Sequence, residues 1–168
     1  MSAYYLDAIQ NANKIAEALH LPPYRDLQPL LEVFLDAFYD SERHLFRDSK
    51  TTQHASFIGN LLPYAYGFCP EDACREAIEN WIAQRGITSV AILGTFPYLY
   101  GLVRNGRQDL LEQGLRDPGA WARMLREDAT TTFEGWGRDS KKNASLFHLT
   151  LSCAAVFLCD ADLKTLFA

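Results

Sequence analysis

Hydrophobic residues recur every three to four positions along most of the chain, which is the spacing of an amphipathic α-helix. The clearest stripe runs from Leu27 to Phe38, where one helical face carries only leucine and phenylalanine. The same periodicity predicts further helices. They cover approximately residues 3–19, 53–66, 70–86, 90–104, 107–115, 117–125 and 143–158, with one more turn expected in the tail 160–168.

Glycine and proline delimit these helices. Gly67, Gly86 and Gly106 follow three of the predicted ends, and Pro70 and Pro118 suit the first turns of two others. The polar stretch 41–52 has turn character and allows a short extended piece at residues 45–47. No long strand and no fixed-period repeat is predicted. The pattern therefore indicates an all-α chain of consecutive helical hairpins, forming a single domain over residues 1–168.

One stretch, from Asp128 to His148, interrupts the helical pattern. Three consecutive threonines, residues 130–132, and the glycines that follow disfavour a helix at its start. The stretch places one carboxylate, Glu134, between the rings of Phe133 and Trp136. Two interpretations are open: a structural loop whose aromatic rings close the end of a core, or a loop that carries chemistry on a helical scaffold.

Composition narrows the possible functions. The chain has 168 residues and a net charge of −5, and its longest run of basic residues is Lys141-Lys142, which disfavours nucleic acid as a partner. The longest apolar run, Cys153 to Cys159, is far shorter than the roughly 20 residues of a membrane span. The start lacks the features of a signal peptide, so we expect a cytoplasmic protein if the chain is complete.

The four cysteines have spacings that match neither a zinc site nor a redox pair, and we expect no metal, no cofactor and no disulfide. Aromatic residues make up 12% of the chain. Such an excess either fills a helical core or lines a cleft in which the apolar faces of sugars stack on rings.

The motifs at 121–125, 129–136 and 142–148 together resemble the C-terminal part of the catalytic domain of bacterial α-L-rhamnosidases. Their most specific elements are Thr-Thr-x-x-Glu-x-Trp and Asn-x-Ser-Leu-x-His, in the order found in that family. Weaker matches lie upstream, at residues 46–49, 52–55 and 66–70.

This resemblance implies about half of an (α/α)6 toroid and an inverting glycoside hydrolase that acts on a rhamnoside-type carbohydrate. By its place in the motif, Glu134 is the general base that activates the attacking water. Trp136, Phe133 and His148 are implied as substrate-binding residues, and His54 is a weaker candidate. Arg47 and Asp48 are expected to form a local turn pair rather than to contact sugar.

The chain also departs from the family pattern. Asp128 stands where the family generally has glycine, Phe133 where it usually has tryptophan, and Leu149 where an aromatic residue is common. The family's Cys-Pro-x-Arg…Trp-x-Gly-Asp region, which holds the general acid, is missing. We therefore expect an isolated chain to be inactive or nearly so. Half a toroid also leaves apolar helix faces uncovered, so association with the remainder of a parent enzyme or with a second copy is expected.

Two alternatives remain. The chain could be a non-catalytic helical-hairpin module that binds a carbohydrate or a protein, or it could belong to a related six-hairpin glycosidase with another sugar substrate. A reading frame that continues upstream into the missing motif would favour the enzyme, whereas a stop codon directly before Met1 would favour a separate module or a decayed gene.

Overall fold

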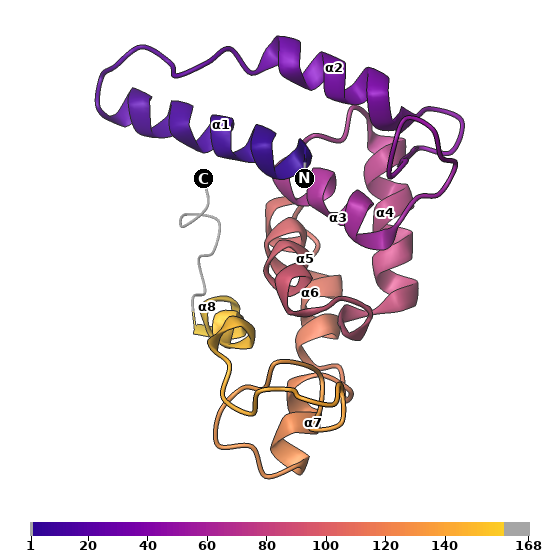
Figure 1. The fold of residues 1–168 in the computed structure, drawn as a ribbon, viewed down its shortest axis with the longest axis vertical. Helices are drawn as coiled ribbons and strands as arrows, with labels where there is room; N and C mark the ends of the chain where they lie inside the picture. The colour runs from indigo at the N-terminus through magenta and orange to yellow at the C-terminus, as the bar shows by residue number, and fades with distance from the viewer. Residues whose placement is uncertain (1, 160–168) are drawn as a thin grey trace. The chain divides into compact units, whose positions relative to one another are not determined.

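The computed structural model describes residues 2–159, and this part of the chain is mostly helical (Figure 1). The α-helices are α1 (Ser2–Ala18), α2 (Gln28–Phe38), α3 (Phe57–Tyr66), α4 (Asp72–Arg85), α5 (Ile92–Arg104), α6 (Gln108–Leu115), α7 (Trp121–Arg126) and α8 (Ala154–Cys159). Two 3₁₀ turns, η1 (Ile87–Ser89) and η2 (Leu149–Cys153), and two short strands, β1 (Tyr39–Asp40) and β2 (Leu45–Phe46), complete the elements. The all-α class predicted from the periodicity is confirmed.

The chain forms two compact units, residues 1–78 and residues 79 onward, and helix α4 crosses the boundary between them. The expectation of a single domain stays a prediction. Among the described residues, no helix combines the length and the apolar character that crossing a membrane requires.

Helix α3 is the central element of the first unit. Most of its side chains are buried, including Leu61 and Ala65, which have no exposed surface. Helix α1 packs against α2 and α3 through Ala3, Leu6 and Ile9, which recur on one face as the helical spacing predicts. The apolar stripe of α2 contributes Phe34, whose ring centroid lies 5.5 Å from that of Phe46 on β2.

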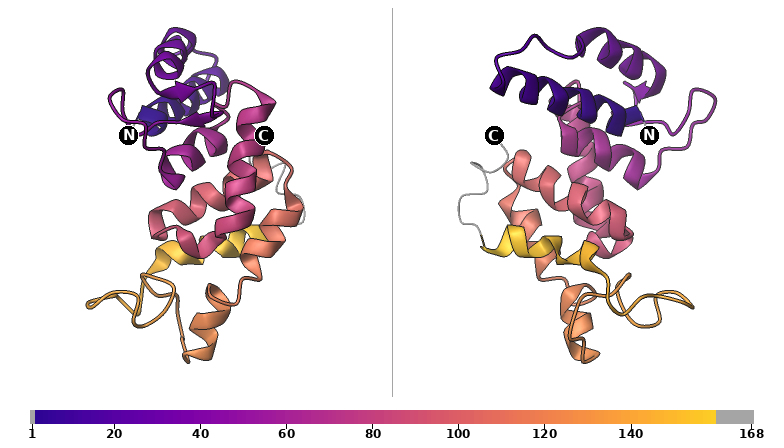
Figure 2. Two further views of the ribbon diagram at one scale, coloured as in Figure 1. Left: turned by 90° about the vertical axis from the view of Figure 1, so that its right-hand side faces the viewer. Right: turned by 60° about the vertical axis from the view of Figure 1, so that its left-hand side comes forward.

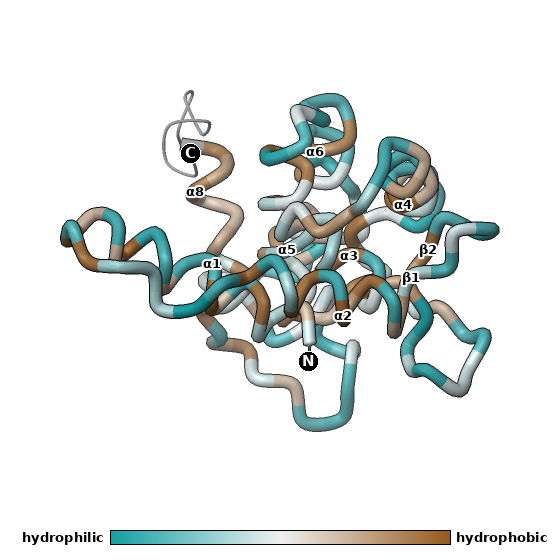
Figure 3. The backbone as a smooth tube through the Cα atoms, turned by 90° about the horizontal axis from the view of Figure 1, so that it is seen from above, coloured by the Kyte–Doolittle hydropathy of each residue, from teal (hydrophilic) through white to brown (hydrophobic). Residues whose placement is uncertain are grey.

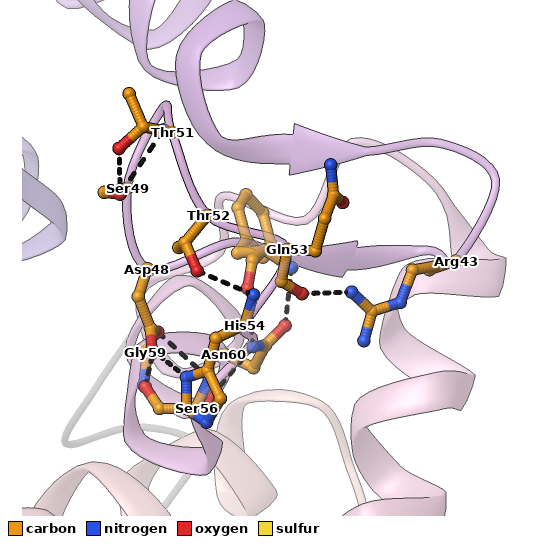
Figure 4. A network of polar contacts seen from close by, with 11 residues as sticks. Arg43, Asp48, Ser49, Thr51, Thr52, Gln53, His54, Ser56, Gly59 and Asn60 are labelled. Carbon is orange, nitrogen blue, oxygen red and sulfur yellow. Dashed lines mark hydrogen bonds and ion pairs between the residues drawn. The ribbon is translucent and has the colours of Figure 1, made fainter.

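A buried amide ties β2 to the first turn of α3 (Figure 4). Asn60 is fully buried, and its Oδ1 accepts a hydrogen bond from the Phe46 N–H at 2.7 Å. Its Nδ2 donates to the carbonyl oxygens of Phe46 and Ser56, each at 2.9 Å. The two bonds to Phe46 hold the backbone of β2, and the bond to Ser56 adds to the one that the Ser56 carbonyl already accepts from the Asn60 backbone N–H.

The carboxylate of Asp48 organises the loop between β2 and α3. It accepts hydrogen bonds from the hydroxyl and the N–H of Ser56, and its other oxygen lies 2.5 Å from Nδ1 of His54 (Figure 4). Burial opposes ionisation, but the hydrogen bonds from Ser56 and His54 outweigh it and lower the pKa of Asp48. Arg47 does not pair with Asp48, so the expected turn pair is wrong. Asp48 instead binds the N-cap residue of α3, and the Arg47 Nε is buried without a hydrogen-bond partner within the described residues.

The core of the second unit forms around α5. Helix α5 packs against α6, η2 and α8 (Figure 2). It buries Tyr98, Leu99 and Leu102. Helix α8 is apolar along its whole length (Figure 3). Its Phe157 is 5% exposed and packs with its ring centroid 5.9 Å from that of Phe96 on α5.

Four helices end in the same way. After α1, α3, α5 and α7, one residue adopts a left-handed conformation and two backbone N–H groups turn back to the last carbonyls, which is the Schellman motif. Gly67 and Gly106 occupy this position after α3 and α5, as predicted, with φ values of 79° and 70°. His20 and Asp128 occupy it after α1 and α7, with φ values of 56° and 55°.

Three predicted helix boundaries are wrong. Helix α3 begins at Phe57 because the side chain of Ser56 caps it by accepting a hydrogen bond from the Gly59 N–H. The helix expected from Pro118 begins only at Trp121, after a turn. Residues 143–148 form no helix, because their backbone groups pair with the chain around Glu134 instead. The turn expected at residues 160–168 lies outside the described residues.

Replacing Asn60 tests the link between β2 and α3. Asn60→Ala should lower the free energy of unfolding by about 2–4 kcal/mol, because it removes the hydrogen-bond partner of both the N–H and the carbonyl of the buried Phe46. Urea unfolding measures the change. Asn11→Ala, at an exposed position of α1, is the matched control and should change stability by less than about 0.5 kcal/mol. Equal effects of the two substitutions would contradict this role of Asn60.

Candidate active site

The residues between α7 and η2 form a long loop, the site loop (residues 127–148), and backbone hydrogen bonds close it on itself. Its first arm (residues 130–134) runs beside its second arm (residues 144–148). The Glu134 N–H donates to the Ser145 carbonyl at 2.8 Å, and the His148 N–H donates to the Thr132 carbonyl at 2.8 Å. The structure thus brings together the two most specific motifs of the sequence.

Aromatic rings anchor the first arm to the helices of its unit. Phe133 is 2% exposed and packs in a cluster with Met124 and Leu151. Trp136 donates its indole N–H to the Val90 carbonyl at 2.8 Å, and its ring meets that of Trp121 edge-on at a centroid distance of 5.0 Å. The carboxylate of Glu134 therefore projects from a segment that is held on both sides.

Both oxygens of the Glu134 carboxylate have partners. Oε1 forms an ion pair with Nζ of Lys141, and Oε2 accepts a hydrogen bond from the Ser145 N–H at 2.9 Å. The side chain of Glu134 is 22% exposed. A carboxylate offers about four acceptor positions, so two remain for a water molecule or a ligand hydroxyl.

These contacts favour the charged form of Glu134. The hydrogen bond from Lys141 lowers the pKa of the carboxyl most, the Ser145 N–H lowers it further, and burial opposes them; the charges of Lys141 and His148 add to the lowering. The pKa of Glu134 therefore lies below its ordinary value, and the group is ionised at neutral pH.

Glu134 borders a hollow of about 360 Å³ on the surface of the second unit. The site loop contributes Glu134, Gly135, Trp136, Ser140 and Lys141 to its lining, and residues 88–92 form the rest. The wall thus combines an aromatic ring, hydroxyl groups, a carboxylate and an ammonium group. Such a surface suits a ligand that has hydroxyl groups on one side and an apolar face on another.

The sequence did not indicate residues 88–92 or Lys141 as part of a site. Thr88 and Ser89 lie in η1, a connection between two helices that carries no motif. The hydrogen bond between Trp136 and Val90 and the packing of Ile92 against the cluster of Phe133 bring this segment to Glu134, and both join residues far apart in the chain. Lys141 carried no signal beyond being half of a short basic pair.

The glycines of the site loop allow close approach between parts of the protein itself. A Cβ atom on Gly135 would lie 2.8 Å from the Cβ of Ser140, and one on Gly137 would lie 2.6 Å from Nε of Arg123. Arg123 in turn pairs with Glu127 and Asp139, at the two ends of this part of the loop. Both glycines therefore serve the folding of the site loop.

The two histidines predicted at the site have different surroundings. His148 caps η2, its Nδ1 accepting from the Thr150 N–H at 3.4 Å, and it lies at the end of the second arm. His54 belongs to the first unit, where it pairs with Asp48 and keeps 72% of its side chain exposed. Among the described residues, no group of three or more His, Cys, Asp or Glu side chains could hold a metal ion.

A family model describing the bacterial α-L-rhamnosidase six-hairpin glycosidase domain matches residues 1–161. The chain belongs to this family. No curated protein and no solved structure matched the chain in the corresponding comparisons. The mostly helical fold and the resemblance found in the sequence agree with this membership. The family supports the assignment of the chain as glycoside hydrolase-like.

The helix end at Asp128 explains one departure from the six-hairpin family pattern. The N–H groups of Asp128 and Ala129 turn back to the carbonyls of Leu125 and Met124, and Asp128 takes the left-handed conformation that ends α7. Glycine adopts this conformation without steric cost, which accounts for the glycine of the family at this position. In this chain, aspartate occupies the position at some cost in stability.

Restoring the glycine should therefore stabilise the chain. Asp128→Gly is expected to raise the free energy of unfolding by about 0.5–1 kcal/mol, the relief of strain being partly offset by the greater freedom of glycine in the unfolded chain. Thermal unfolding measures the change. Lys142→Gly, at an exposed loop position without positive φ and without an ion pair among the described residues, is the control and should not stabilise. A lower melting temperature for Asp128→Gly would contradict this reading.

Proposed function

We propose that this chain provides the general base of an inverting glycoside hydrolase that cleaves α-L-rhamnoside-type glycosides, and that Glu134 is this base. The observation that supports the proposal best is the setting of Glu134. Its carboxylate is ionised, keeps free acceptor positions and borders a hollow lined by Trp136 and hydroxyl groups. Family membership supplies the reaction class.

In this reaction, Glu134 accepts a proton from a water molecule while the water oxygen bonds to the anomeric carbon. The bond from that carbon to the leaving oxygen breaks at the same time, and a general acid gives the leaving oxygen a proton. Attack from the face opposite the leaving group inverts the configuration. The separation of about 6.5–9.5 Å between acid and base in such enzymes leaves room for the water.

The remaining candidates take supporting roles. Trp136 borders the hollow and offers a ring for stacking against the sugar. His148 supplies an imidazole at the end of the second arm, where it can donate to or accept from a sugar hydroxyl. Phe133 supports the first arm from within the core and so fixes the backbone of its neighbour Glu134. We propose His54 as a sugar contact only on the strength of the sequence match.

We further propose that the general acid comes from outside these 168 residues. It would lie in another segment of a parent enzyme or in an associated chain, because the motif that carries it in the family is missing from this sequence. The 168-residue chain alone is then expected to bind the sugar weakly and to hydrolyse it very slowly or not at all.

Replacing Glu134 tests the assignment of the base. In the natural enzyme that contains residues 1–168, Glu134→Gln should lower kcat on p-nitrophenyl α-L-rhamnoside by about 10²–10⁴-fold. The amide keeps the shape of the side chain and can still accept from the Ser145 N–H, but it cannot take a proton from water. Release of p-nitrophenol measures the rate.

Glu112→Gln is the matched control, because Glu112 is an exposed glutamate on α6 of the same unit. It should leave the rate unchanged. An unchanged rate in Glu134→Gln would overturn the base assignment. A wild-type enzyme that binds L-rhamnose, seen as a shift of the Trp136 indole N–H resonance, but never hydrolyses the glycoside would favour the non-catalytic module.

A further inference from the structure

Lys141 is the group in closest contact with the proposed base. Its Nζ forms an ion pair with Oε1 of Glu134, although the lysine side chain is 54% exposed and the site loop around it has no helix. Its neighbour Lys142 is exposed as well and forms no ion pair among the described residues. Of these two adjacent lysines, Lys141 is the one that contacts Glu134.

We propose that Lys141 is the positioning residue of this site: it holds the Glu134 carboxylate in the orientation that receives the proton from the attacking water. The inference deepens the proposed function and rests on it. In the structure, Lys141 contacts the carboxylate of Glu134. It acts through Glu134 alone.

The orientation follows from two contacts on opposite oxygens. The Ser145 N–H comes from the second arm and binds Oε2, while Lys141 binds Oε1. A carboxylate held at one oxygen only can still turn about its terminal bond, because that torsion is broad. When both oxygens are held, the free lone pairs of the Glu134 carboxylate point in fixed directions. A water molecule in the hollow can then bind the carboxylate in one orientation.

The fold of the site loop makes this contact possible. Gly135 has no Cβ, and the Ser140 side chain occupies the space where one would lie. This close approach brings residues 140 and 141 alongside residues 134 and 135. Asp139, which directly precedes Ser140, is tied to α7 by its ion pair with Arg123. Lys141 therefore reaches Glu134 from a segment that is fixed at its start.

The pairing also sets the pH range in which the base works. Among the described residues, the charged or titratable groups that act on Glu134 are Lys141 and His148. Both lower the pKa of Glu134, so the carboxylate stays ionised as the pH falls. Removing Lys141 raises that pKa. Glu134 then becomes protonated at a higher pH, and the acidic limb of the plot of rate against pH moves to higher pH.

The test compares Lys141→Met with Lys142→Met, a control on the adjacent residue. The titration of the Glu134 side-chain carbon is followed by ¹³C NMR in the 168-residue chain, and the pH dependence of kcat/KM is measured in the natural enzyme. Lys141→Met should raise the pKa of Glu134 and move the midpoint of the acidic limb upward by the same amount. It should also lower kcat by about tenfold or more at the pH optimum.

Lys142→Met should change neither quantity, and Lys141→Arg, which keeps the charge, should restore most of the rate. An unchanged Glu134 titration in Lys141→Met would overturn the proposal. So would a raised pKa with an unchanged rate at the optimum. The proposed function would fail by a different result. Full activity of the Glu134→Gln enzyme would refute the assignment of Glu134 as the base, whereas the NMR result for Lys141→Met would not be affected.

Discussion

The pairing between the two arms of the site loop is the interaction on which the site depends. Glu134 takes part twice, giving its N–H to the Ser145 carbonyl and accepting the Ser145 N–H on its carboxylate. This exchange converts a polar loop of more than 20 residues into a defined element. The exchange fixes the position of the Glu134 carboxylate, and the Ser145 N–H also favours its charged form.

The rest of the second unit serves this pairing. Phe133 is held in the core, Trp136 is tied to Val90, and the left-handed Asp128 turns the chain from α7 into the first arm. On the second arm, η2 begins directly after His148, and Trp121 donates its indole N–H to the Leu151 carbonyl at 2.8 Å. The helices of the second unit thus support a loop whose shape comes from hydrogen bonds rather than from regular secondary structure.

Sequence periodicity predicted most of the helices, because their apolar stripes and terminal glycines are local signals. It failed at residues 143–148, where pairing with the first arm replaces the helix that the local pattern favours. The motifs indicated Glu134 and Trp136, since their spacing is specific. The sequence could not indicate Lys141 or residues 88–92, because their place at the site depends on contacts between distant segments.

Glu134 is the proposed base that directs water to the face opposite the leaving group. Chemical rescue tests this most directly. In the Glu134→Ala enzyme, the lost carboxylate leaves space for azide, which needs no base and attacks where water would. The account predicts that azide restores turnover of an α-L-rhamnoside and that NMR identifies the product as β-L-rhamnosyl azide, with inverted configuration. A rescued product of α configuration, or no rescue in a folded and sugar-binding variant, would contradict it.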